Sequence, residues 1–592
     1  MYQTLFWLLP ILAIWLGWTA FSAYCLYCNY LQARKIGVPI RVIPIDHLNK
    51  AWLLVDRQVI ALVRRLPWVI GKNSFTRFNY RGWHEDDGTR AHDEMGDAFV
   101  LVTPSRNWLY IADPDALMDM YRRGKDFPRW VEITKMLDVF GGPNIATATG
   151  EQWKTHRKLV NAGMNEQCNA VVWSEAASLG DQMARYWATK RVFTSVGEDS
   201  RTVSLHILCK ACFGQSFPFE GHEDREDGSV SASFRFSLVT IMENALLILA
   251  LQPGFFMRRW LPLPAAWKRV GMACKEFKCQ MARMYTQKLQ ALTMSDAKED
   301  MTLMDSLVRT SQKGEVPLTE SEIYGTLFVV SFAGHDTTAH LLTFSIFFLA
   351  ANPSVQDWLA QELHHVLGDR PTSQWVYRKD FPRLRRCLAI LYETLRLKTP
   401  VAEAKWNGSH SQCLSIHGQM LHIPPGTLLI PSYIHVHNNP RIWGRDAREW
   451  KPERWIMQSS GNNTGNITVS NSDHYIPGQN TSEDRLDTET THKSCNIDQE
   501  RLLLPPSRGA YLGWSEGSRD CPGKKFSHVE WVAVLAALFR DWRVEPVQRQ
   551  DETSAESQTR VLDFVASNTG YGGLLLQLLH PERLPLVWTR RT

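Results

Sequence analysis

The sequence has little excess charge of either sign and few cysteines. Its 66 lysines and arginines exceed its 61 aspartates and glutamates by only five, too small a surplus for a nucleic-acid-binding protein of this length. Its 11 cysteines are far fewer than a disulfide scaffold needs, and since the number is odd, at least one thiol is unpaired within the chain. No repeat of about 20–50 residues is visible. We therefore expect a globular protein of a reducing compartment, or one cysteine with a role of its own.

Charged residues are absent from positions 1–33, and Arg34, Lys35 and Arg41 follow. As a helix, this mostly apolar run is long enough to cross a hydrocarbon core of about 30 Å. A cleaved signal peptide is the alternative, but the run is too long, lacks a basic start, and is followed by no clear small-residue cleavage site. The sequence thus predicts a transmembrane anchor over 1–33, with the rest of the chain on the cytosolic side.

Helical patterns dominate most of the chain before residue 400. Helices are expected at 150–190, 200–213, 230–250, 265–295, 319–350, 353–368 and 383–397. Two apolar runs around Pro104 and Ser105 predict a hairpin. Further strands are expected at 419–423, 427–430 and near 561–579. We therefore predict a mainly α fold with small β-sheets: one large domain over 61–592, joined to the anchor by a basic linker with proline and glycine at 34–60.

The segment from Met457 to Glu500 differs in composition from its surroundings. It is rich in asparagine, serine, threonine and glycine, and its seven acidic and two basic residues give it a net charge of −5. Such a polar segment buries too little apolar surface to fold alone. We predict a solvated, disordered surface insertion over 457–500.

The sequence around Cys521 combines features that suit a metal-bound thiolate. Gly517 and Gly523 allow tight turns and the close approach of a flat ligand. The cysteine directly precedes an apolar helical run, so backbone amides and the start of that helix can stabilise a negative sulfur. Lone cysteines are usually small buried apolar side chains, but here an aromatic ring, an arginine and the two glycines stand at fixed spacing from the sulfur (Trp514, Gly517, Arg519 and Gly523).

This spacing resembles the haem-binding loop of cytochrome P450 monooxygenases, in which the cysteine thiolate is the axial ligand of the haem iron. Trp514 replaces the phenylalanine usual at its position but keeps an aromatic ring. The resemblance covers most of the chain and is to membrane-anchored, fungal-like members of the family. It implies the cytochrome P450 fold, haem b as the cofactor, Cys521 as the iron ligand and Arg519 as a partner of a haem propionate.

A second stretch resembling this family lies in the middle of the helix expected at 319–350, at Ala333, Gly334, Asp336 and Thr337. A glycine followed by a threonine hydroxyl can open a turn of such a helix. The apolar flanks indicate that Asp336 is buried, where a carboxylate without a role is costly. The resemblance implies that Gly334 contacts the cofactor, and that Asp336 and Thr337 act as a catalytic acid–alcohol pair that relays protons.

Three further residues match a structural network of the family. Glu393 and Arg396 form an E-x-x-R motif, which alone is a common surface pair on one face of a helix. Arg454 follows at the place where relatives have a second arginine. The resemblance implies a Glu–Arg–Arg network that stabilises the structure behind the haem and takes no part in catalysis.

The resemblance also implies basic partners for the haem propionates. Trp153 and Arg157 lie one helical turn apart and match a W-x-x-x-R helix, so both are expected to hydrogen-bond a propionate. Lys405 stands near where many relatives have an arginine, and a lysine offers a point charge in place of a fork. Lysines on the thiolate side would suit an acidic electron donor (Lys154, Lys158, Lys524 and Lys525).

The resemblance implies a haem-thiolate monooxygenase that inserts one atom of O2 into a lipophilic small molecule, by hydroxylation or epoxidation, in secondary metabolism. NADPH-cytochrome P450 reductase would deliver the electrons of NADPH at the endoplasmic reticulum membrane. One alternative is a haem-thiolate isomerase or dehydratase without a reductase, which the pair Asp336 and Thr337 argues against. The other is a membrane-anchored interaction protein, which would leave four motifs in the correct order unexplained.

Overall fold

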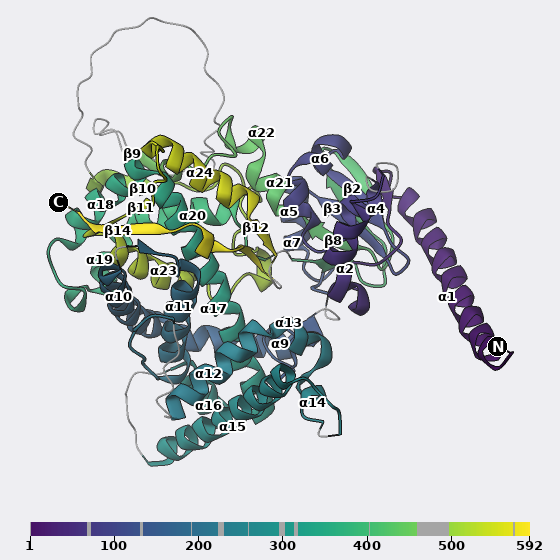
Figure 1. Cartoon of the computed structure of the whole chain (residues 1–592), viewed down its shortest axis with the longest axis horizontal. Coiled ribbons are helices and arrows are strands. Elements are labelled where there is room, and N and C mark those ends of the chain that lie inside the picture. The colour runs from purple at the N-terminus through teal and green to yellow at the C-terminus, as the bar shows by residue number, and fades with distance from the viewer. Residues whose placement is uncertain are drawn as a thin grey trace, which may run out of the picture.

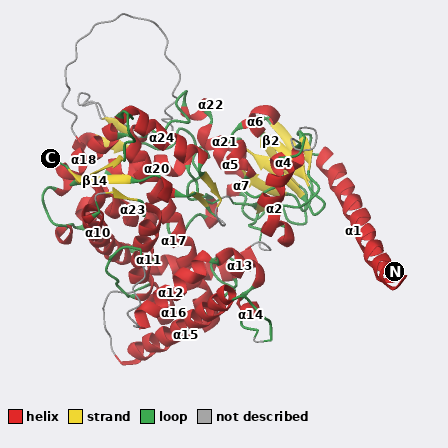
Figure 2. Ribbon diagram, viewed as in Figure 1, coloured by secondary structure: helices red, strands yellow, loops and turns green. Residues whose placement is uncertain are grey.

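The computed structural model is mainly helical, with short strands in small sheets (Figure 2). It describes residues 2–67, 73–130, 134–190, 192–222, 230–258, 260–294, 302–312, 318–401, 403–458, 497–571 and 575–591. The mainly α fold with small β-sheets that the sequence predicts is confirmed.

The uncharged N-terminal run forms one helix, α1 (Tyr2–Arg34), which projects from the rest of the protein (Figure 1). Its last turns pack on the body, where the Asn29 side-chain amide donates to the Thr103 carbonyl oxygen at 2.9 Å and Ala33 is fully buried. Among the described residues, no single helix has the length and hydropathy of a membrane span. One bent pair has both together, α17 (Glu320–Ala351) and α18 (Pro353–Leu367), at 111°. The anchor stays a prediction.

The largest sheet has the strand order β1-β2-β3-β8-β5 and lies between two helices. One face packs on α2 (Lys50–Val63) and the other on α7 (Pro114–Arg122). The strands are β1 (Ile40–Val42), β2 (Ala98–Val102), β3 (Asn107–Ile111), β5 (Lys405–Trp406) and β8 (Leu428–Pro431). The antiparallel pair β2 and β3 confirms the hairpin expected around Pro104. Because β1 and most of α2 fall within 34–60, the expected linker is part of the folded body, and the boundary at residue 61 falls within a helix.

The helices that carry the sequence motifs lie in the helix-rich part of the molecule (Figure 1). They are α9 (Gly150–Gly163), α17, α20 (Arg385–Leu397) and α23 (Lys524–Phe539). α17 begins at a capping box between Thr319 and Glu322 and runs without interruption for 32 residues, most of them buried. The expected opening of a turn therefore does not break this helix.

Three expectations for secondary structure are wrong in part. The pattern at 150–190 contains two helices, because the Asn165 side chain accepts from backbone amides at the start of α10 (Glu166–Thr189) and so begins a new helix. The pattern at 230–250 is likewise divided, into α12 (Val230–Glu243) and α13 (Ala245–Leu251). The pattern near 561–579 begins within a capped helix, α24 (Ser554–Ser567), and only then forms the strands β12 (Thr569–Tyr571) and β13 (Leu576–Leu578).

The other helices and strands complete the body. The helices are α4 (Ser74–Phe78), α5 (Trp83–Asp87), α6 (Arg90–Met95), α11 (Val196–Phe213), α14 (Pro253–Phe256), α15 (Ala265–Met294), α16 (Leu303–Gln312), α19 (Tyr377–Asp380), α21 (Tyr433–Asn438) and α22 (Pro440–Trp443). The strands are β4 (Val192–Phe193), β6 (Gln412–Ile416), β7 (Gln419–Ile423), β11 (Trp542–Pro546) and β14 (Leu586–Arg590).

The polar segment 457–500 is joined firmly to the body at its ends. There β9 (Ile456–Gln458) pairs antiparallel with β10 (Glu500–Leu502). Arg386 of α20 makes an ion pair with Glu500 at 2.6 Å, and both side chains are buried. The disorder predicted over 457–500 is therefore wrong at both ends, because the pairing of these strands orders them. Residues 459–496 lie outside the described residues.

Candidate functional site

Cys521 lies in a tight loop between the single turn Gly517–Arg519 and α23. Its backbone amide donates to the Trp514 carbonyl oxygen at 2.9 Å. Gly517 has a φ of 78°, and a Cβ there would come within 2.7 Å of the Tyr121 carbonyl oxygen. Only glycine fits that position without strain, so the turn expected from the sequence is present.

The electrostatics of the loop differ from the expectation. Protein atoms around the sulfur raise the pKa of the Cys521 thiol by desolvation, although the residue as a whole is exposed. The Gly523 amide opposes this rise, and the Asp520 carboxylate adds to it. The loop therefore does not favour the thiolate by itself. A cation at the sulfur reverses this balance, and haem iron is such a cation.

The central helix has an accessible stretch in the middle of the core. Between Glu322 and Ala351, every residue of α17 is buried except Phe332, Ala333, Gly334, Asp336 and Thr337. The Cys521 residue is also exposed, although most of the helix that follows it is buried. Accessible positions inside a core indicate space for a ligand, and an exposed cysteine residue suits an axial iron ligand.

Four charged side chains lie where the largest sheet meets the cysteine loop. Lys405 of β5 pairs with Glu403 at 2.6 Å, and Arg129, which forms a β-bridge to Lys405, faces the same carboxylate at 3.4 Å. Arg519 is close enough for Arg129 and Glu403 to affect its pKa, which burial lowers to about 10. Three cations and one anion leave a net charge of +2, which complements the two propionates of a haem.

The sequence did not single out Arg129 or Glu403. Nothing around Arg129 forms a motif, and Glu403 stands in a short irregular stretch. The β-bridge between Arg129 and Lys405, with the hydrogen bond from the Trp406 amide to the Pro128 carbonyl oxygen at 2.9 Å, brings Arg129 beside Glu403.

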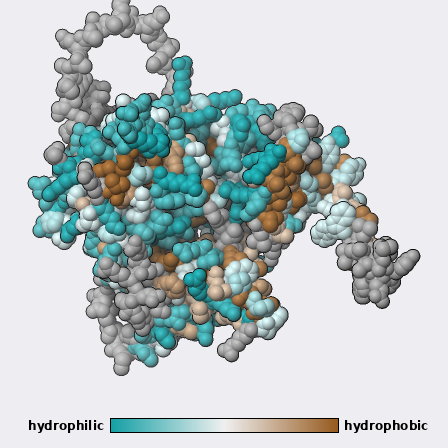
Figure 3. All heavy atoms as spheres, in the orientation of Figure 1, coloured by the Kyte–Doolittle hydropathy of each residue, from teal (hydrophilic) through white to brown (hydrophobic). Residues whose placement is uncertain are grey.

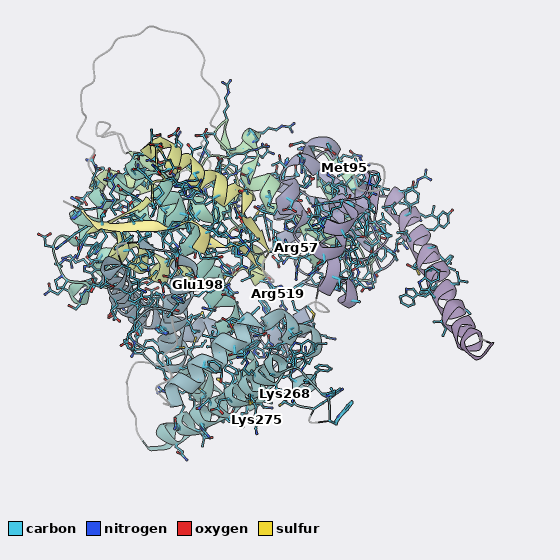
Figure 4. The ribbon with its side chains drawn as sticks, in the orientation of Figure 1. Arg57, Met95, Glu198, Lys268, Lys275 and Arg519 are labelled. Atoms are coloured by element: carbon cyan, nitrogen blue, oxygen red, sulfur yellow. The ribbon has the colours of Figure 1, made fainter. Side chains whose placement is uncertain are left out.

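Trp153 and Arg157 lie beside the cysteine loop, and their hydrogen bonds to a haem propionate stay a prediction. The Arg157 guanidinium donates to both the carbonyl oxygen and the carboxylate of Asp520, each at 2.5 Å. The Arg519 guanidinium lies over the Trp153 ring, with Cζ 4.5 Å from the ring centroid. Arg519 also donates to the Ala148 carbonyl oxygen at 2.7 Å. Arg157 therefore ties α9 to the residue before the cysteine. Figure 4 labels Arg519 between the helix-rich part and the part that carries the largest sheet.

Asp336 lies among basic side chains at the accessible stretch of α17. Arg201 of α11 pairs with its carboxylate at 3.3 Å, and His335 lies at 3.5 Å. Burial raises the pKa of Asp336, but His335, His340 and Arg201 outweigh burial, so the pKa is below its ordinary value. The sequence did not single out Arg201.

Thr337 and Gly334 face different groups. The Thr337 hydroxyl donates to the Ala333 carbonyl oxygen at 2.7 Å, one turn earlier. A Cβ on Gly334 would come within 3.2 Å of the Leu208 side chain, so this glycine lets α11 approach α17 closely. Helix packing thus accounts for Gly334, and its contact with the cofactor stays a prediction.

Glu393, Arg396 and Arg454 form one buried network. The Glu393 carboxylate pairs with Arg396 at 2.8 Å and with Arg454 at 2.9 Å. Trp455 Nε1 donates to its other oxygen at 2.9 Å, and Arg454 also pairs with Asp446 at 3.1 Å. The network joins α20 to the segment that follows α22.

Comparisons with known proteins agree with this site. The model of the cytochrome P450 family matches residues 73–477, more than half of the chain. A cytochrome P450 monooxygenase of Arthrobotrys oligospora is 26% identical, with 90% of each chain covered. A cytochrome P450 monooxygenase of the phomenoic acid biosynthesis cluster of Leptosphaeria maculans is also 26% identical, with 92% of this chain and 93% of the relative covered.

These matches favour neither alternative, the reductase-independent isomerase or the interaction protein. They agree with the exposed Cys521 residue and with the net positive charge beside it, which fit a haem. The chain belongs to the cytochrome P450 family of haem-thiolate monooxygenases.

Proposed function

We propose that the enzyme inserts one oxygen atom into a lipophilic product of secondary metabolism, using a haem held by Cys521. The accessible Cys521 residue, beside a cluster of net charge +2, is the observation that carries the proposal. The relative from Leptosphaeria maculans, named for a biosynthesis cluster, supports the substrate class.

The haem would be held by a small set of side chains. Cys521 would bind the iron, and Arg129, Lys405 and Arg519 would bind the propionates. Trp153 would support Arg519, and Arg157 would hold the cysteine loop through Asp520. When bound, haem supplies the reductive activation of O2 and the transfer of one of its atoms to a C–H or C=C bond.

Protons would reach the site through α17. The Asp336 carboxylate is ionised and paired with Arg201, so it can exchange protons with water as that pair opens. The Thr337 hydroxyl, which donates to the Ala333 carbonyl oxygen, would turn toward the substrate side to orient a water. The apolar flanks of this stretch would exclude other water.

Electrons and membrane contact would come from outside the body. NADPH-cytochrome P450 reductase would dock on exposed lysines near the cysteine loop, such as Lys154. The endoplasmic reticulum membrane would hold α1, on which Ile14, Trp15 and Trp18 are exposed. Figure 3 shows further apolar surface over α2, where Val55 and Leu62 are exposed.

The test is Cys521→Ser. A serine hydroxyl is a poor ligand, so the carbon monoxide difference spectrum should lose the red-shifted thiolate band and turnover should be lost. A variant that still hydroxylates substrate with reductase would place the axial ligand elsewhere. Thr337→Ala tests the proton path separately: the thiolate band should remain, while product formed per NADPH consumed falls. An unchanged ratio would leave Thr337 a packing residue.

A further inference from the structure

Glu403 joins its own segment to two others that are distant in the chain, residues 121–129 and the loop before Cys521. Its Oε1 accepts from Lys405 Nζ at 2.6 Å and from Arg129 at 3.4 Å. Its Oε2 accepts from the Tyr121 hydroxyl of α7 at 3.3 Å and from the Ser515 hydroxyl. Ser515 belongs to the loop that leads to Cys521. One carboxylate therefore contacts both the cations of the site and the cysteine loop.

The backbone of Ser515 is held in an unusual conformation. Its φ is 61°, in the left-handed region that side-chain-bearing residues rarely adopt. Such a conformation persists only where neighbouring contacts fix it. The amide of Ser515 donates to the Leu512 carbonyl oxygen at 3.0 Å, and its hydroxyl donates to Glu403. The carboxylate thus holds the loop at a strained position six residues before the cysteine.

Glu403 is ionised although only 10% of its side chain is exposed. Burial raises its pKa, but Lys405, Arg129 and the hydrogen bond from Ser515 outweigh burial and hold the pKa below its ordinary value. Burial lowers the pKa of Lys405, and Glu403 opposes that shift. The site therefore contains a permanent negative charge among its cations.

We propose that Glu403 is a positioning residue, which fixes the cysteine loop relative to the propionate-binding cations and keeps a negative charge beside the haem site. This inference rests on the proposed haem site. Because a nearby negative charge opposes the addition of an electron, Glu403 would hold the ferric/ferrous midpoint potential lower than a neutral side chain would.

The first test compares Glu403→Gln with Glu552→Gln in the full-length holoenzyme. Glu552 is also a largely buried carboxylate, paired with Arg560 at 2.6 Å, but its partners lie around the start of α24. Redox titration should give a higher midpoint potential for Glu403→Gln than for wild type, and an unchanged potential for Glu552→Gln. Glu403→Asp keeps the negative charge, so its midpoint potential should lie close to that of wild type. A potential for Glu403→Gln equal to that of wild type would overturn the proposal.

The second test uses two serines of the same loop and decides the matter if Glu403→Gln does not bind haem. Ser515→Ala removes the hydrogen bond to Glu403, whereas Ser518 is exposed and serves as the control. In the carbon monoxide complex on mild heating, Ser515→Ala should lose the thiolate band about tenfold faster than wild type, as expected for one hydrogen bond to a charged group. Ser518→Ala should match wild type. Equal rates for both variants would mean that Glu403 does not hold the loop.

A failure of the proposed function can be distinguished from a failure of the proposed role of Glu403. If wild type lacks the thiolate band, the proposed function is wrong. If wild type has the band and the midpoint potential of Glu403→Gln equals that of wild type, or the loss rates of the two serine variants are equal, only the role of Glu403 is wrong.

Discussion

The protein contains two clusters of buried charged side chains, one around Glu393 and one around Glu403, and their charges are balanced differently. In the Glu393 network, the two buried arginines face two carboxylates, those of Glu393 and Asp446. The exposed Lys451 also pairs with Asp446 at 2.9 Å, from the solvent side. Arg396 donates in addition to backbone carbonyl oxygens such as that of Ala447 at 2.6 Å. In the Glu403 cluster, three cations share one carboxylate. A balanced cluster has satisfied its charges within the protein, so it stabilises the fold. A cluster with surplus cations keeps binding capacity for an anionic ligand.

The largest expected effect is on the balanced cluster. Arg396→Leu leaves the Glu393 carboxylate buried beside a single arginine, which costs about 3–5 kcal/mol of the free energy of unfolding. We expect little soluble protein and a much lower midpoint of thermal unfolding. If Arg396→Leu unfolds at the wild-type temperature, the network is not a structural element.

Glu530 is a buried carboxylate that has no cationic partner among the residues that the structure describes, and it extends the comparison to a third case. Glu530 of α23 is 1% exposed, and burial raises its pKa to about 8, with the Ser204 hydroxyl opposing. The folded protein therefore keeps a proton that the unfolded chain loses above its ordinary pKa of 4.5. Stability should then fall by a few kcal/mol as the pH rises toward 8.

Urea unfolding between pH 5 and 8.5 measures this predicted fall in the free energy of unfolding. Glu530→Gln cannot ionise, so its stability should depend less on pH than that of wild type. Parallel pH profiles for the two proteins would show that Glu530 ionises normally in the fold.

Substitutions in the Glu403 cluster should change how tightly haem is retained and leave the stability of the fold nearly unchanged. Arg519→Ala removes one propionate partner, worth about 1.5–3 kcal/mol, so transfer of haem to an excess of apomyoglobin should be about 10–100-fold faster. The midpoint of thermal unfolding of the apoprotein should change little. Lys154→Ala, which removes an exposed cation on a neighbouring helix, is the control. Equal rates of haem transfer for Arg519→Ala and Lys154→Ala would mean that Arg519 does not bind a propionate.

The smallest expected effect is that of Lys405→Arg. A guanidinium can bind a carboxylate with two parallel hydrogen bonds, whereas an ammonium is a point charge. Because Lys405 already pairs with Glu403 at 2.6 Å, the gain should be less than about 1 kcal/mol, seen as slightly slower haem transfer. Faster haem transfer would mean that this buried position does not accommodate the larger guanidinium.

Sequence reasoning succeeded where the relevant residues are close in the chain. The hairpin around Pro104 and the turn at Gly517 follow from local backbone preferences. It failed where two local signals compete: the apolar pattern at 150–190 conceals the cap at Asn165, and strand-like residues after Val561 continue a helix that Thr553 has begun. Caps decide such boundaries because they satisfy amides that have no partner within the helix.

By itself, the sequence determined the family, the mainly α fold and the residues of each motif, since fixed spacing within one loop or helix fixes which side chains can act together. Only the tertiary structure decided the partners of those residues. Arg157 faces Asp520, Gly334 faces Leu208, and Arg129 reaches Glu403 through a β-bridge. Pairings between distant segments depend on how helices and strands pack, and packing buries apolar surface collectively, with no signature in any one stretch of the chain.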